Sequence, residues 1–155
     1  MSLTGDYEPS ASAWVRQHVE QIVRTGTTEG VTISGLPTVL ITYRGARTGR
    51  IRKTPLMRVE HEGRYAAVAS KGGAPTNPQW YKSLVAEPVI KVQDGAVSGE
   101  YRAREVFGEE KALWWGRAVD AYPPYADYQR RTDRQIPVFV LEPVGEAVPT
   151  DADRG

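Results

Sequence analysis

Apolar side chains recur along the chain with two different periods, and these separate helices from strands. Residues 10–26 carry them every three to four positions and end at a glycine, which is typical of an amphipathic helix. A second helix is expected over 77–88, with Asn77 as its N-cap. A third is expected over 108–132, interrupted at its proline pair.

Short runs of β-branched residues lie between these helices. Residues 54–70 contain two such runs on either side of Glu62-Gly63, which predicts an antiparallel hairpin. The other strands are expected over 38–43, 89–93, 100–106 and 136–143. About six short strands with mostly local connections favour an antiparallel sheet that closes into a small barrel, with helices packed outside. The predicted class is mainly β or α+β.

The chain of 155 residues, with 40% hydrophobic and 25% charged residues, has the size and composition of one globular domain. We expect an N-terminal amphipathic helix region over 1–26, a barrel domain over 27–145 and a flexible tail over 146–155. No apolar run approaches the ~20 residues that span a bilayer, and the first residues lack the pattern of a secretory signal. The expected location is the cytoplasm. Peripheral contact of the first helix with the inner face of the membrane is left open.

The charge and the scarce metal-binding residues exclude several functions. A net charge of +1 argues against a nucleic-acid binder. The absence of cysteine excludes disulfides, thiolate metal sites and a cysteine nucleophile. The two histidines, His18 and His61, are not at metal-ligand spacing, so no metal site is expected.

Positive charge is concentrated in the stretch TYRGARTGRIRKTPL, residues 42–56. It places five cations between Arg44 and Lys53 without an acidic residue, whereas the rest of the chain sums to about −4. Gly45 and Gly49 permit positive φ, so backbone N–H groups could converge on an anion. The planar guanidinium suits phosphate or carboxylate. Anion binding and a solvated surface loop remain equal alternatives on these grounds.

Two further patterns are candidates for a site. ASKGGAPTNPQWY, residues 69–81, reads as a strand that turns through two glycines into a helix, and free N–H groups there would attract an anion. It reads equally well as an ordinary structural corner. Tyr122, Tyr125 and Tyr128 would lie on one side of a helix, and such aromatic groups more often belong to a core than to a cofactor site.

Together the segments LITYRGARTGRIRKTPL, VASKGGAPTNPQWYKSLVAEPVIKVQDG and AYPPYADYQRRTDRQIPVFVLEP resemble the deazaflavin-dependent nitroreductase family of actinobacteria, over about residues 36–143. Members of that family are small split-β-barrel oxidoreductases that use coenzyme F-420, whose phosphodiester and oligoglutamate tail are anionic. The resemblance implies that the cationic loop holds these groups. It also implies a split barrel of about six antiparallel strands.

The same resemblance assigns residues to the site. Cofactor contacts are implied for Arg47, Thr48, Arg52, Lys53, Thr54, Pro55, Ala69, Ser70, Lys71, Gly72, Gly73, Asn77, Trp80 and Tyr81. Arg44 and Arg50 are weaker candidates. The substrate side is implied for Ser70, Tyr122, Tyr125 and Tyr128.

The implied activity is hydride transfer from reduced F-420 to an electron-poor acceptor, quinone-like and also nitroaromatic or nitroimidazole. Ser70 would donate to the acceptor oxygen as it becomes negative, and Tyr125 would orient the substrate or relay a proton. Two alternatives stay open: a split-barrel protein that binds FMN or haem, and a protein that binds the deazaflavin without catalysis. The chain could act as a monomer or a homodimer.

Overall fold

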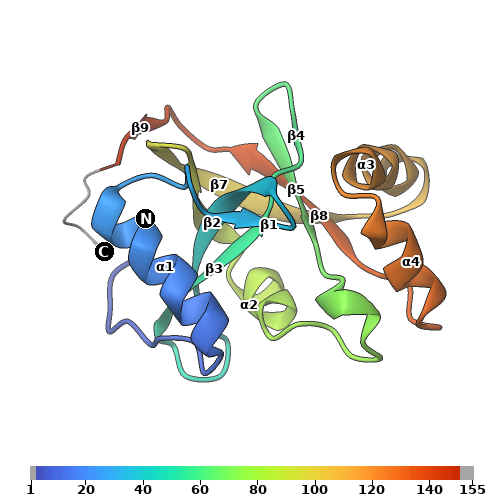
Figure 1. The fold of residues 1–155 in the computed structure, drawn as a ribbon, viewed down its shortest axis with the longest axis horizontal. Helices are drawn as coiled ribbons and strands as arrows, with labels where there is room; N and C mark the ends of the chain where they lie inside the picture. Colours follow the sequence, from blue (N-terminus) through green and yellow to red (C-terminus); the bar gives the residue numbers. More distant parts are fainter. Residues whose placement is uncertain (1–2, 151–155) are drawn as a thin grey trace.

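The computed structural model describes residues 3–150, which form a nine-stranded antiparallel sheet curled into a half-barrel, with helices around it (Figure 1). The strands are β1 Thr32–Ile33, β2 Leu36–Arg44, β3 Ile51–Met57, β4 Glu60–His61, β5 Arg64–Val68, β6 Val89–Asp94, β7 Val97–Val106, β8 Val138–Pro143 and β9 Val148–Pro149. The helices are α1 Ala13–Thr25, the 3-10 turn η1 Lys71–Gly73, α2 Trp80–Ala86, α3 Gly108–Ala121 and α4 Pro124–Arg130. The expected class, a split barrel with helices outside, is confirmed.

Strand β2 shows why the sheet has two distinct faces. Its side chains alternate, so Val39 and Ile41 point into the barrel while Leu40 points outward. The barrel interior also receives Trp80 and Leu84 from α2, which covers one end of it. Successive side chains of β2 therefore contribute in turn to the barrel interior and to the outer face of the sheet.

The strand order β1-β2-β6-β7-β8-β5-β4, with β3 paired to β2, corrects one expectation. Residues 54–57 do not pair with the strand after Glu62-Gly63. They belong to β3, whose partner is β2. The turn itself is present, because Glu62 and Gly63 both have positive φ (52° and 79°) and join β4 to β5. Only the two-residue β4 occupies the place predicted for a full strand.

The outer face of the sheet is covered in two places. Helix α1 packs Val19 and Ile22 against Leu40 of β2. Helix α3 packs Trp114 against the outward side chains of β5 and β8, including Val138. The two covers lie at opposite ends of the sheet, as Figure 1 shows.

Helix α1 has the predicted extent and clear end signals. The Ser12 hydroxyl accepts from the Val15 N–H, and Gly26 ends the helix in the left-handed region with φ 75°. The sheet buries its apolar stripe, although Trp14 remains 49% exposed. Among residues 3–150, no helix has the length and apolar character required to cross a membrane.

The other two helices differ in how well they match expectation. The helix predicted over 77–88 begins at Trp80, and Asn77 does not cap it, because its side-chain oxygen accepts from Arg134 instead. The predicted break at the proline pair is confirmed. Helix α3 ends at Ala121, and α4 begins at Pro124, which needs no N–H partner in the first turn.

The segments near both chain ends pair with the sheet. Tyr7 forms a parallel bridge with Ile51, so the segment before α1 covers part of the β3 edge. Val148–Pro149 pairs with β7. The remainder of the predicted tail, 151–155, lies outside the described residues.

Candidate functional site

The basic loop is the tip of the β2–β3 hairpin. Its backbone is closed by Gly45 N–H to Arg50 O at 2.8 Å, and Ala46 N–H donates to the Ser83 hydroxyl of α2 at 3.0 Å. Gly49 has φ 73°, but Gly45 is not left-handed. The predicted nest of N–H groups built from both glycines is therefore wrong. The loop is instead a hairpin tip held against α2.

Two of the loop arginines are engaged by groups of the protein itself. Arg44 forms an ion pair with Glu87 at 3.3 Å. Arg52 lies 3.5 Å from the carboxylate of Glu8, which also accepts from the Thr48 hydroxyl at 3.2 Å. Arg52 and Thr48 thus already hold a carboxylate supplied by the segment before α1, which shows that their geometry suits such an anion.

The other two loop arginines face solvent. Arg47 and Arg50 are exposed, and within the described part of the chain neither side chain makes a hydrogen bond or ion pair. They are the loop cations that could meet an added anion without first losing an internal partner.

The corner after β5 is built from three consecutive residues with positive φ: Lys71 (46°), Gly72 (63°) and Gly73 (81°). Gly73 N–H donates to Ser70 O at 2.9 Å, which closes the turn. Only glycine adopts this conformation at low cost, so Lys71 is a strained position. Ala69 and Ser70 are buried, whereas Lys71 and Gly72 are exposed.

Arg134, in the connection from α4 to β8, braces this corner. Its guanidinium donates to three carbonyl oxygens and one amide: Ala69 O at 3.0 Å, Ser70 O at 2.9 Å, Ala74 O at 2.9 Å and Asn77 Oδ1 at 2.6 Å. No signal in the sequence distinguishes Arg134 from its neighbours, because partners such as Ala69 and Asn77 lie 65 and 57 residues away along the chain.

The three tyrosines form one cluster beside the corner. The hydroxyls of Tyr122 and Tyr128 are 2.8 Å apart, and the rings of Tyr122 and Tyr125 meet edge to face at 4.9 Å. Burial, reinforced by its two tyrosine neighbours, raises the pKa of Tyr125. A Cβ on Gly73 would lie 2.7 Å from Tyr128 O, so the backbone of the corner touches α4 directly. The structure therefore brings together the Ser70 corner and the tyrosines.

Several other expected residues lie beneath this surface. Trp80 packs inside the barrel against Phe139, and the Tyr81 hydroxyl donates to Glu105 at 2.6 Å. Thr54 pairs in register with Ile41, and Pro55 is buried on the outer face. Trp80 and Tyr81 support the corner from the core side.

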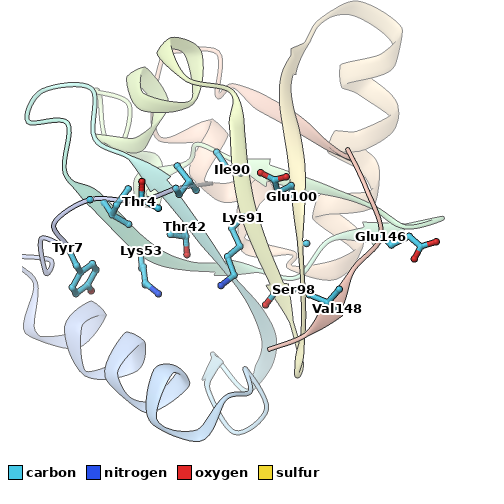
Figure 2. Close-up of a pocket in the computed structure, with 14 residues that line it drawn as sticks. Thr4, Tyr7, Thr42, Lys53, Ile90, Lys91, Ser98, Glu100, Glu146 and Val148 are labelled. Atoms are coloured by element: carbon cyan, nitrogen blue, oxygen red, sulfur yellow. The ribbon is translucent and has the colours of Figure 1, made fainter. Parts of the chain in front are cut away.

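Lys53 is separated from the rest of the expected site. It points into a cavity of about 820 Å³ on the outer face, between the segment before α1 and the sheet (Figure 2). Of the residues expected at the cofactor, Lys53 alone lines this cavity. The expected residues therefore fall into three places: the hairpin tip, the corner with its tyrosines, and the cavity. Within residues 3–150, no group of three or more acidic or histidine side chains could hold a metal ion.

Comparison with known proteins establishes the family. A family model described as F420H(2)-dependent quinone reductase matches residues 14–143. The chain belongs to this family. Membership confirms the predicted family, the oxidoreductase class and the F-420 cofactor. F420H(2) is the reduced form of that cofactor.

Relatives of this family member include named reductases and solved structures. An F420H(2)-dependent quinone reductase of Mycobacterium tuberculosis is 34% identical over 143 residues, which cover 84% of this chain and 96% of the relative. A solved F420-H2 dependent reductase is 55% identical, with a TM-score of 0.65, and covers 68% of this chain and 94% of its own. A solved domain-swapped dimer is 52% identical, with a TM-score of 0.68, and covers 86% of this chain and all of its own.

The residues present fit such a cofactor. An acidic tail needs exposed cations, and Arg47 and Arg50 at the hairpin tip provide them. The carboxylate of Glu8 lies against Arg52 and Thr48, so the positions of these two donors are compatible with an oxyanion.

Proposed function

We propose that this family member transfers a hydride from reduced F-420 to a quinone-like acceptor at the corner formed by residues 70–73 and the tyrosine cluster. One observation carries the proposal: the Ser70 corner, braced by Arg134, is in direct backbone contact with α4, which bears the tyrosines. An exposed turn beside aromatic walls offers a flat face on which two rings can stack.

The cofactor side is supplied by backbone and cations. Bound F-420 provides the two-electron hydride donor. Arg47 and Arg50 would meet its anionic groups first, and Arg52 with Thr48 would take them up where Glu8 now sits. The turn at Lys71, Gly72 and Gly73 would border the ring, with Asn77 and Trp80 beneath it.

The substrate side depends on Ser70 and the tyrosines. In the described part of the chain the Ser70 hydroxyl has no hydrogen-bond partner, so it is available to donate to an acceptor oxygen as charge develops there. Burial makes Tyr125 a poorer acid than free tyrosine, so its proposed role is to shape the wall rather than to deliver a proton. Tyr128, which is half-buried, is the member best placed to meet the acceptor. Nitroaromatic compounds are flat and electron-poor as well, and are proposed as secondary acceptors.

Ser70→Ala tests the substrate side with 2-methyl-1,4-naphthoquinone as acceptor. We expect kcat to fall by about 10²-fold, as for loss of one oxyanion donor, while F-420 affinity is unchanged. Ser34→Ala, at the exposed turn between β1 and β2, is the matched control. An unchanged kcat in Ser70→Ala would remove the serine from the mechanism.

Cofactor choice is tested by fluorescence titration of the purified chain with F-420 and with FMN. Binding of F-420 and not FMN is expected. Micromolar FMN binding without F-420 binding would overturn the proposal. If no quinone or nitro compound speeds oxidation of the bound reduced cofactor, the chain binds the deazaflavin without catalysis.

A further inference from the structure

A row of polar residues crosses the outer face of the sheet at the level of Thr42. In register, Lys53 of β3 lies on one side of Thr42 and Lys91 of β6 on the other. Adjacent strands are about 4.8 Å apart, so the two lysine Cα atoms are only two strand spacings from each other. Figure 2 shows both side chains projecting from the same side of the sheet into the cavity that they line.

Lys91 lies opposite Glu100 of β7 in register, but no ion pair joins either ammonium group to an acidic residue of the described chain. Lys53 is only 9% exposed, and within residues 3–150 neither lysine forms an ion pair or hydrogen bond. The Lys53 Nζ lies over the Tyr7 ring, 6.0 Å from its centre. Burial and the charge of Lys91 lower the pKa of Lys53 to about 8. A buried ammonium beside a second, half-buried one is unfavourable, and an anion placed between them would offset both the burial and the repulsion.

The surrounding cavity indicates the kind of anion. Its volume, about 820 Å³, is within the roughly 300–1,000 Å³ typical of small-molecule sites. Ile51, Tyr7 and Val148 give it apolar walls. Glu100 and Glu146 also line it, and Figure 2 shows Glu100 turned away from the Lys91 ammonium. Acidic residues at one end disfavour a polyanion, while apolar walls favour a ligand with a single charged head.

We propose that this cavity binds an amphipathic monocarboxylate, with its carboxylate between Lys53 and Lys91 and its apolar body against Ile51, Tyr7 and Val148. The Thr42 hydroxyl, at the centre of the row, is positioned to donate to the same carboxylate. The site is distinct from the hydride-transfer corner, since neither Ser70 nor any of the three tyrosines lines the cavity.

Octanoate is the test ligand, and 1-octanol is its uncharged counterpart. Titration of the full chain, followed by amide NMR shifts and calorimetry, should show octanoate binding at least about tenfold tighter than octanol, as expected for a charge-assisted contact. The shifts should map to Thr42, Lys91 and their strand neighbours. Equal affinity for the two ligands, or shifts confined to another face, would overturn the proposal.

Lys91→Gln removes one ammonium without touching the residues proposed for hydride transfer. It should weaken octanoate by about tenfold and leave octanol and F-420 binding unchanged. Lys82→Gln on the exposed face of α2 is the matched control and should change neither. If a γ-glutamyl tripeptide binds more tightly than octanoate and needs Lys91, the cavity belongs to the acidic tail of the cofactor and the proposal fails. The wild-type comparison of octanoate with octanol stands even if a variant does not fold.

Discussion

Arg134 donates a hydrogen bond to the carbonyl oxygen of Ser70 at 2.9 Å, and through the same guanidinium it fixes the whole corner. The corner therefore depends on a side chain that follows it by 64 residues in sequence.

Arg134→Met should loosen this corner and destabilise the protein. It would leave the carbonyls of Ala69 and Ala74 without the donor that they have among the described residues, whereas Ser70 O keeps the Gly73 N–H. Each buried unpaired acceptor costs about 1–3 kcal/mol. We expect a loss of about 2–4 kcal/mol in the free energy of unfolding by urea titration. Arg130→Met, which breaks only an exposed pair with Asp127, should cost less than about 1 kcal/mol. Equal losses of unfolding free energy in the two variants would show that the Arg134 guanidinium does not stabilise the corner.

Gly73→Ala and Gly72→Ala form a matched pair. Both glycines have positive φ, which costs an alanine about 1 kcal/mol. At Gly73 the new methyl would also meet Tyr128 O at 2.7 Å, whereas at Gly72 nothing lies within 4 Å. Gly73→Ala should therefore lose at least about 1 kcal/mol more stability than Gly72→Ala and should lower kcat with it. The melting temperature and the kcat of the two variants are measured side by side. Similar melting temperatures would show that the corner backbone does not press against Tyr128 O.

Glu8→Gln should strengthen cofactor binding if Arg52 and Thr48 hold the anionic groups of F-420. At present Glu8 occupies these donors, and a neutral amide would compete less well for them. We expect about a three- to tenfold lower Kd for F-420, measured by fluorescence at low salt. The control, Glu29→Gln, removes an exposed carboxylate elsewhere. A weaker affinity in Glu8→Gln would mean that the carboxylate organises the site rather than competing for it.

Lys53→Met should stabilise the protein in a pH-dependent way. The folded-state pKa of Lys53, about 8, is below its ordinary 10.5, so the unfolded chain binds more protons between these values and wild-type stability rises with pH across that window. At pH 7 the charged lysine is buried at a cost, and methionine should add about 1–3 kcal/mol. Urea titrations at pH 7 and 9.5 should show this gain shrinking as pH rises, whereas Lys82→Met should show no such change. A gain that is constant with pH would contradict the assignment.

The parts of the fold with strong local periodicity are predictable. Helix α1 and strand β8 follow from their apolar spacing, and the break before Pro124 follows from the geometry of proline. The pairing of β3 is not predictable in the same way. Residues 54–57 are as compatible with the following strand as with β2, and the hairpin turn over residues 45–50 is what pairs them with β2.

The candidate site shows the same division between local and non-local information. The cations of the loop and the glycines of the corner are contiguous in sequence, so both can be recognised as candidate site residues from the sequence alone. The roles of Arg134 and Lys91 cannot be recognised in this way, because they depend on other elements. Arg134 acts on the corner, and Lys91 lies in register with Thr42. The cap predicted at Asn77 is wrong because the arginine that claims its side chain is 57 residues away.

Alternation along β2 also bears on how such proteins diversify. Positions 39 and 41 fill the interior and tolerate little change, while Thr42 and its neighbours across the sheet face the outer cavity. Substitutions at these outward positions can alter what the surface recognises and leave the barrel packed as before. New ligand preferences can thus evolve on this scaffold one alternate residue at a time.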